Sequence, residues 1–459
     1  MKKLIFLLSV ALICFAFIRL DEKAADKPEH IPASKQRNGN AEKGFAYLIT
    51  GDYIKSGIPY SLFMLATKKD TNNFLNRSGN NKKLSHDLTA INAPNGELIV
   101  APNCLQCHAQ IMDGKLILGL GNSLSDFTKS QEPSAKFADK FLKHLTGDQA
   151  KKYEAAKNFI TALKMVAPNL VLPTKGLNVA DELAALLASH RDPETLTWSD
   201  KTLLSLPDGI VPTDVPAWWL LKKKNAMFYN GFGRGDFSRF LMASNLLTVT
   251  DTAEAKDVDN HFPDVLAYIN SITPPKYPKA IDQTLADKGN VIFNGHCSRC
   301  HGTYGASENY PNLLIPESII QTDPLLYSSN YSNPQFVTWF NKSWFTSGQY
   351  AAKLVPYRGY IAPPLDGIWI TAPYLHNGSV PDLETLLNSK KRPIYWKRNF
   401  KKPEYNYDSP GWIYEKTNAA TDNETYNTTL RGYGNGGHNF GDKLSATERK
   451  SVIEYLKTL

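Results

Sequence analysis

The spacing of apolar and polar residues divides the chain into stretches of helical periodicity and one clear strand. Apolar positions recur at helical spacing over four stretches: 134–145, 150–165, 179–189 and 280–296. A strand-like apolar run over residues 96–103 ends in a proline turn. A further helix is expected at the C-terminus, where Ser445 and Glu448 form a capping box ahead of an apolar stripe.

One face of the predicted helix 280–296 indicates a close helix partner. Gly289, Phe293 and Cys297 lie four residues apart and therefore share this face. The glycine allows a second backbone to approach. The C-terminal helix is the expected partner, and its stripe consists of Val452, Tyr455, Leu456 and Leu459.

The N-terminus has the pattern of an export signal. Lys2 and Lys3 precede an apolar run from Leu4 to Ile18, which is short for a membrane span. Residues 1–20 are therefore expected to be a cleaved signal peptide or a short membrane anchor. Either would place the folded part outside the cytoplasmic membrane, in a periplasmic or extracellular-facing position. The polar and charged residues 21–43 are expected to be a flexible spacer.

A proline cluster marks the predicted boundary between two folded units. Pro274, Pro275 and Pro278 remove backbone donors and block helix formation. The N-terminal unit is expected to span residues 44–272, and the C-terminal unit residues 279–459.

The pattern C-x-x-C-H occurs twice, as Cys104, Cys107 and His108 and again as Cys297, Cys300 and His301. This spacing allows two thiols to add to the vinyl groups of one haem while the next residue presents imidazole to the iron. A redox pair or half of a zinc site would explain a single copy. Two copies use every cysteine outside the leader. The sequence therefore predicts two covalently bound haem c groups with His108 and His301 as iron ligands.

Composition narrows the class of protein further. The chain has 459 residues, is 42% hydrophobic, and carries a net charge of +8 from scattered lysines. Nucleic-acid binding needs a concentrated basic surface, so no nucleic-acid partner is expected. The five cysteines exclude a disulfide framework, since four belong to the motifs. Covalent haem implies maturation outside the cytoplasmic membrane.

The two motifs have different surroundings. The second follows directly on a predicted helix, as in an ordinary cytochrome c domain, with Phe293 expected at the haem edge. The first follows a strand and a proline turn. The N-terminal unit is therefore expected to be a divergent haem lobe, and this divergence suggests a task other than simple electron carriage.

The sixth iron ligand of the second haem cannot be a methionine of its own lobe, because no methionine follows Met242. The histidines available there are His376 and His438. A lone histidine is more often structural than a ligand, so one of these two is expected to be structural. The glycine-rich setting of His438 lets backbone approach a porphyrin face. We favour His438.

For the first haem the histidine candidates are His144, His190 and His261, or no ligand. His190 follows a helical run, where a helix C-terminus explains it. His144 lies on a predicted surface helix. An open or water-occupied iron is therefore our expectation at the first motif.

Several segments together resemble the rubber-oxygenase-like branch of the di-haem cytochrome c peroxidase superfamily. Around the second haem they are residues 294–305, 364–369, 372–379 and the Gly437-His438 pair. In the N-terminal unit they are residues 224–231, 233–236, 101–104 and 119–122. The resemblance spans roughly residues 44–459.

This resemblance implies a mainly α fold class, with two cytochrome c-like haem lobes, long loops and a few short strands. It implies that the N-terminal haem is the reactive one. The C-terminal haem would be a six-coordinate electron relay held by His301 and His438. The substrate-side aromatic of rubber oxygenases has the candidates Trp218, Trp219, Phe228 and Phe232, each of which is also explained as core.

Three functions then remain open. The first is a peroxidase that receives electrons from a small redox protein, for which Glu97 and Asp113 are the acids nearest the first motif. The second is an oxygenase that activates dioxygen and cleaves an apolar alkene or polyisoprene-like substrate. The third is a non-catalytic electron-transfer cytochrome. We favour an oxidoreductase that acts on peroxide or dioxygen.

Overall fold

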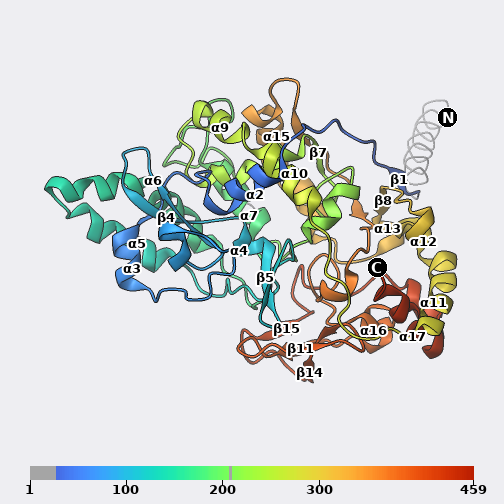
Figure 1. Cartoon of the computed structure of the whole chain (residues 1–459). Helices are drawn as coiled ribbons and strands as arrows, with labels where there is room; N and C mark the ends of the chain where they lie inside the picture. Colours follow the sequence, from blue (N-terminus) through green and yellow to red (C-terminus); the bar gives the residue numbers. More distant parts are fainter. Residues whose placement is uncertain (1–26, 206–208) are drawn as a thin grey trace, which may run out of the picture.

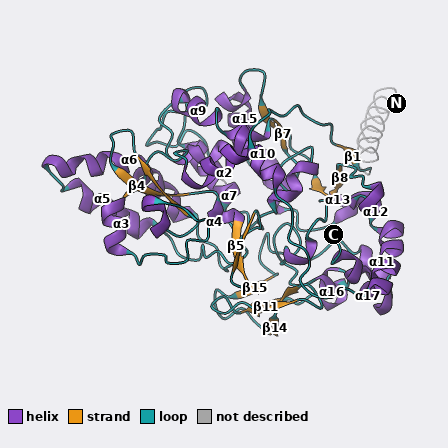
Figure 2. Ribbon diagram, viewed as in Figure 1, coloured by secondary structure: helices purple, strands orange, loops and turns teal. Residues whose placement is uncertain are grey.

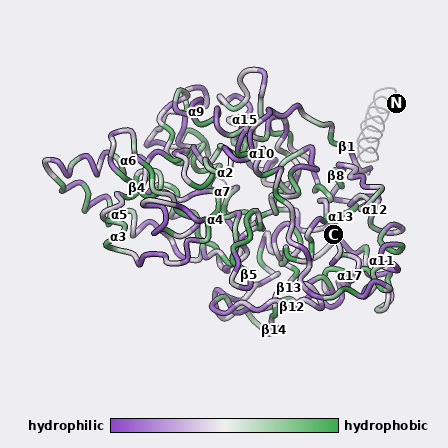
Figure 3. The backbone as a smooth tube through the Cα atoms, viewed as in Figure 1, coloured by the Kyte–Doolittle hydropathy of each residue, from purple (hydrophilic) through white to green (hydrophobic). Residues whose placement is uncertain are grey.

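The computed structural model describes residues 27–205 and 209–459 (Figure 1). The predicted signal peptide or anchor at residues 1–20 lies outside the described residues. Among the residues described, no helix combines the length and apolarity needed to cross a membrane. Hydrophobic and hydrophilic residues alternate over short stretches of the backbone (Figure 3).

The helices are distributed over the whole described chain. They are α2 (Ala41–Thr50), α3 (Tyr60–Ala66), α4 (Leu105–His108), α5 (Glu132–Lys143), α6 (Ala150–Val166), α7 (Ala180–Ser189), α8 (Phe237–Leu241), α9 (Thr252–Asp259), α10 (Phe262–Ser271), α11 (Gln283–His296), α12 (Ser298–His301), α13 (Glu317–Ile320), α14 (Leu325–Ser332), α15 (Pro334–Lys342), α16 (Leu383–Leu386) and α17 (Ala446–Leu456). Short 3₁₀ helices lie between them. One of these, η4 (Trp218–Lys223), carries Trp218, which stacks on His108.

The strands form six small sheets in the described part of the chain (Figure 2). Three sheets have three strands: β1 (Glu29–His30), β8 (Leu313–Pro316) and β10 (Gly359–Ile361); β2 (Ile58–Pro59), β4 (Leu98–Pro102) and β3 (Leu88–Asn92); and β14 (Tyr414–Thr417), β11 (Tyr395–Arg398) and β15 (Thr425–Asn427). The other three are pairs: β5 (Ala109–Met112) with β6 (Lys115–Leu118), β7 (Gly233–Gly235) with β9 (Ala352–Leu354), and β12 (Tyr405–Asn406) with β13 (Gly411–Trp412).

The expectation of a mainly α fold class was wrong. The described residues are 41% helical and 14% strand, in mixed small sheets, and two cytochrome c-like haem lobes are not clearly shown. The strands β11, β14 and β15 explain part of the error. They come from tyrosine- and threonine-rich segments of three or four residues, which have strand propensity but are too short for a periodic signal.

The long predicted helices of the N-terminal unit are confirmed as α5, α6 and α7. The predicted strand before the first motif is confirmed as β4. It pairs antiparallel with β3, and Ala93 to Gly96 form the connecting turn, in which Gly96 has a φ of 81°. Strand β4 of this hairpin ends at Pro102, two residues before Cys104, and α4 with the rest of the first motif follows.

The predicted pairing of α11 with α17 is also confirmed. A Cβ on Gly289 would lie 1.9 Å from the carbonyl oxygen of Ser451, so the two backbones are in contact at this point. Phe293 packs on Tyr455 with ring centroids 5.2 Å apart. Ser445 and Glu448 form the capping box that starts α17. The helix pair ends at the second motif, which α12 carries (Figure 1).

The described part of the predicted spacer is held against the folded body. Strand β1 pairs with β8, and Ile31 is buried. The Arg37 guanidinium contacts Asp236 and Asp259 at 3.0 and 2.6 Å. This cation joins the N-terminal segment to two buried carboxylates of the body, so residues 29–37 are not a free linker.

The largest hydrophobic cluster crosses the predicted boundary at residues 273–278. It begins at Leu48 and contains Trp339, Phe340 and Leu354 of α15 and β9. A second cluster surrounds Phe293 and the C-terminal helix. The division into units 44–272 and 279–459 remains a prediction.

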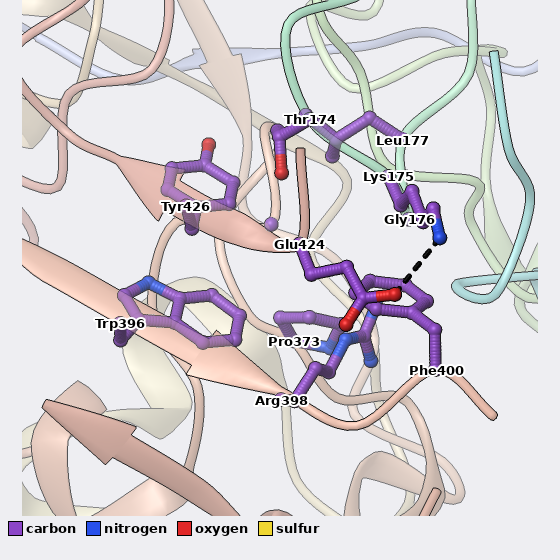
Figure 4. Close-up of a pocket in the computed structure, with 11 residues that line it drawn as sticks. Thr174, Lys175, Gly176, Leu177, Pro373, Trp396, Arg398, Phe400, Glu424 and Tyr426 are labelled. Atoms are coloured by element: carbon purple, nitrogen blue, oxygen red, sulfur yellow. Dashed lines mark hydrogen bonds and ion pairs between the residues drawn. The ribbon is translucent and has the colours of Figure 1, made fainter. Parts of the chain in front are cut away.

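A small pocket lies where segment 174–177 meets the sheet of β11 and β15 (Figure 4). Lys175 pairs with Glu424 at 2.9 Å, and Arg398 stacks on Phe400 at 4.7 Å. Its volume is about 10 Å³, room for roughly one water. The pocket is therefore a packed joint between distant segments and has no space for an organic ligand.

Candidate haem sites

The second motif lies at the wall of a large cavity. Helix α11 ends at His296, and the Cys297 N–H donates to the Phe293 carbonyl oxygen at 2.7 Å. The chain then turns into α12, which brings Cys297, Cys300 and His301 into the wall of a cavity of about 400 Å³. Most of the other lining residues are apolar. This volume and this apolar lining are typical of cavities that bind a large organic group.

His301 is held in one tautomer by a backbone carbonyl. Its Nδ1–H donates to the Pro363 oxygen at 2.8 Å, because a carbonyl can only accept. The Nε2 lone pair is then free, which is the form that binds a metal. Burial lowers the pKa of His301. The imidazole is therefore neutral, as an iron ligand must be.

His438 lies across the same cavity from His301. The two ring centroids are 6.1 Å apart, with an angle of 62° between the planes. The backbone N–H of His438 donates to the Ile320 carbonyl oxygen at 2.8 Å. A Cβ on Gly437 would lie 2.2 Å from the Gln321 carbonyl carbon. The glycine thus lets the loop press onto α13, which positions the histidine.

The separation of these rings fits one shared metal. A metal–imidazole bond is about 2 Å and the ring centre lies about 1 Å beyond the nitrogen, so a centroid separation of roughly 6 Å would allow both imidazoles to bind one metal. Burial also lowers the pKa of His438 to about 3, which keeps this imidazole neutral. Its Nδ1 is buried and has no hydrogen-bond partner among the residues that the structure describes. The pair and the two cysteines together fit a haem c group.

His376, the alternative to His438, is engaged elsewhere on the cavity wall. Its Nε2 lies 3.1 Å from the Tyr360 hydroxyl, and its ring stacks on the Tyr360 ring with centroids 4.2 Å apart. One nitrogen and one ring face are thereby used. This geometry favours His438 as the partner of His301.

The first motif lies at the centre of the molecule on α4 (Figure 1). The backbone N–H of Cys104 donates to the Tyr53 hydroxyl at 3.2 Å. The His108 ring stacks on Trp218 with centroids 4.5 Å apart and 19° between the planes. Within residues 27–205 and 209–459, His108 Nδ1 is buried without a hydrogen-bond partner, and burial lowers the pKa of His108 to about 3. This imidazole is also neutral and fixed by packing.

The histidines weighed as a sixth ligand of the first haem each have another contact. His144 Nδ1 lies 2.6 Å from the Lys140 carbonyl oxygen in the last turn of α5. His190 stacks on Trp198 and contacts the Ser199 carbonyl oxygen at 2.9 Å. His261 stacks on Tyr47 at 4.4 Å.

The candidate acids near the first motif are engaged as well. Glu97 forms an ion pair with Lys151 at 3.6 Å. Asp113 accepts a hydrogen bond from the Tyr407 hydroxyl. Neither contact involves the motif itself.

The candidate aromatics are all part of the packing. Trp218 lies on His108, whereas Trp219 donates from its indole to the Asp366 carbonyl oxygen at 2.8 Å. Phe228 and Phe232 pack on each other with centroids 5.1 Å apart. Of the four, Trp218 is the one that stacks on the motif histidine, whereas Phe228 and Phe232 belong to the cluster that packs around Cys104 and Leu105.

Two positioning groups were missed from the sequence. The Pro363 carbonyl orients His301, and the Tyr53 hydroxyl holds Cys104. Pro363 precedes a recognisable segment at 364–369 and could have been considered. Tyr53 carries no signal, since it lies 51 residues before its partner.

Comparison with known proteins gives one family match and two relatives. Residues 359–397 match the family described as RoxA-like, cytochrome c-like. The uncharacterized protein y4iM of Sinorhizobium fredii is 24% identical over 310 residues, which is 59% of this chain and 69% of that protein. The uncharacterized protein y4iJ of the same organism is 39% identical over 111 residues, 22% of this chain and 18% of that protein. This chain thus spans less than a fifth of y4iJ.

The matched segment supplies a large part of the second cavity. It contains Tyr360, Pro363 and His376, which line the cavity or orient His301. The match therefore relates this chain to the RoxA-like cytochromes c, a class of protein that carries haem c.

Proposed function

We propose that this chain is an exported di-haem c-type cytochrome that reduces peroxide or activates dioxygen at its N-terminal haem. Cys104 and Cys107 would hold one haem c with His108 on the iron, and Cys297 and Cys300 the other with His301 and His438. Bound there, each haem supplies one-electron chemistry at iron. The proposal places the chain in the rubber-oxygenase-like branch of the di-haem peroxidase superfamily, and it makes the redox partner a small electron-donor protein.

One observation carries the proposal. His301 and His438 face each other at 6.1 Å across a cavity that Cys297 and Cys300 also line. Two imidazoles on one iron saturate it and leave no position for a small molecule. This supports an electron-relay role at the second motif and directs substrate chemistry to the first.

The arrangement of η4 supports electron exchange between the two motifs. Trp218 of this short helix stacks on His108, while Leu220 and the preceding Ala217 line the second cavity. One short helix and the residue before it thus contact both candidate haem sites. His108 therefore contacts Trp218, whose chain neighbour Ala217 already lines the second cavity.

We assign no histidine besides His108 to an iron at the first motif. His144, His190 and His261 each have a contact that explains them without iron. We therefore propose an exchangeable sixth position at this iron, where peroxide or dioxygen would bind.

The test is steady-state turnover of the holoprotein. With hydrogen peroxide and a reduced small donor protein, peroxidase activity predicts peroxide-dependent oxidation of the donor. Oxygen uptake in the presence of an apolar alkene, without peroxide turnover, would instead identify the oxygenase. If neither reaction occurs while both haems cycle between oxidation states, the electron-carrier alternative replaces this proposal.

A further inference from the structure

The cavity at the second motif has a polar side as well as apolar walls. Its charged lining residues, besides histidines, are Asp214, Lys224 and Arg299. Asp214 is satisfied within the protein, since it accepts a hydrogen bond from the Tyr229 hydroxyl at 2.8 Å. Arg299 is exposed and therefore solvated. Lys224 differs from both.

The ammonium of Lys224 has few partners that would offset its positive charge. It directly follows η4, and its Nζ donates one long hydrogen bond, 3.3 Å, to the Phe228 carbonyl oxygen. Within residues 27–205 and 209–459, no carboxylate lies within 4 Å of it, whereas its neighbour Lys223 pairs with Asp366 at 2.6 Å. Burial lowers the pKa of Lys224 to about 8, so the amine is still mostly protonated at neutral pH.

Lys224 is half-buried, and an ammonium that is partly removed from water without an anion costs free energy, so proteins normally pair such a charge. Haem carries two propionate groups, which are anions on flexible arms. The cavity that Lys224 lines is the one that also contains Cys297, Cys300, His301 and His438.

We infer that Lys224 is the counter-ion of a propionate of the second haem, and that it thereby sets the reduction potential of this haem. This inference rests on the proposed haem at the second motif. Neutralising the propionate favours the ferrous state, because the uncompensated carboxylate would stabilise the extra positive charge of ferric iron.

The experiment is spectroelectrochemical titration of the holoprotein with three variants. Lys224→Met removes the charge, Lys224→Arg retains it, and Lys222→Met is the matched control. Lys222 lies on η4 two residues away, is exposed, and contacts the Ile272 carbonyl oxygen at 3.3 Å. Haem content per chain is measured for every variant.

Lys224→Met is expected to shift the reduction equilibrium of the low-spin haem at least tenfold toward the oxidised form, which is about 59 mV lower for one electron. The Arg variant and the Lys222 control should keep the wild-type value. The haem at Cys104 and Cys107 should not change its potential in any variant.

Full haem content with an unchanged potential in Lys224→Met would overturn the inference. If Lys224→Met loses the second haem during maturation, retention of both haems in Lys224→Arg still supports a charge requirement, and loss in both variants contradicts it. A wild-type protein without haem at Cys297 and Cys300 would refute the proposed function instead, so the two failures are distinguishable.

Discussion

At the scale of residues, three imidazoles in different surroundings are the proposed iron ligands. His301 is fixed by the Pro363 carbonyl, His438 by packing of its glycine-rich loop, and His108 by the Trp218 ring. Each is half-buried, and desolvation lowers the pKa of each imidazole, which favours its neutral form. Their chemical environments, rather than residue type, distinguish them from His376, whose Nε2 contacts Tyr360.

The assignment of His438 leads to a spectroscopic prediction. His438→Gly should convert the second haem from low spin to high spin, because one of its two strong-field ligands is lost. Added imidazole should restore the low-spin spectrum. His376→Gln is the matched control and should leave the ligation intact. The reverse pattern would transfer the role of ligand to His376.

The cysteines give an independent prediction about stoichiometry. The denatured wild-type protein should retain two haems per chain, measured as the alkaline pyridine haemochrome. Cys104→Ala and Cys297→Ala should each retain one, since each change removes a thioether of a different motif and impairs attachment there. A wild-type ratio of one would show that only a single motif is used.

At the scale of elements, the contact between α11 and α17 positions the second motif. The Gly289 backbone touches the Ser451 carbonyl oxygen, and the Phe293 ring packs on Tyr455. Because α11 ends at His296, directly before Cys297, any displacement of this helix pair moves the cysteines and the histidine of the second motif.

We therefore predict that Gly289→Ala lowers the free energy of unfolding by about 1–3 kcal/mol, the usual cost of overpacking, because backbone must shift to admit the methyl group. Gly295→Ala is the control on the same helix, where a Cβ meets no atom within 4 Å. It should be neutral or stabilising by up to about 1 kcal/mol. Urea titration followed by circular dichroism measures both. Equal effects would disprove the close approach.

The elements also show what the sequence could and could not predict. The pair α11–α17 was predictable because the glycine, the capping box and the apolar stripe are local signals. The hairpin β3–β4 was half predictable: its second strand was identified, but its partner β3 was not. The contact of η4 with His108 was not predictable, since Trp218 reads as ordinary core and lies 110 residues from its partner.

At the scale of the whole molecule, segments that are distant in the sequence pack against one another. Residues 29–37 run from β8 to the carboxylates Asp236 and Asp259, and α15 and β9 complete the largest core cluster. Such contacts join segments that lie far apart in the sequence. They were missed because a polar N-terminal segment has no periodicity from which docking can be inferred.

Arg37 tests this long-range closure. Arg37→Met should destabilise the fold by about 1–3 kcal/mol, because the buried Asp236 loses its cation while Asp259 keeps only its pair with Arg239. Lys35→Met, an exposed position of the same segment, should change stability by less than about 0.5 kcal/mol. Denaturant titration gives both values. An Arg37 effect as small as that of Lys35 would mean that the N-terminal segment contributes little to the folded state.

The proposed division of roles is that the iron at the second motif is saturated by two histidines, whereas the iron at the first motif keeps an exchangeable position. Its most direct test is titration of the fully reduced protein with carbon monoxide, recorded as the amount bound per chain. We predict that one carbon monoxide binds per two haems, with the spectrum of the His301–His438 haem unchanged. Binding at neither haem, or at both, would contradict the division of roles between the two motifs.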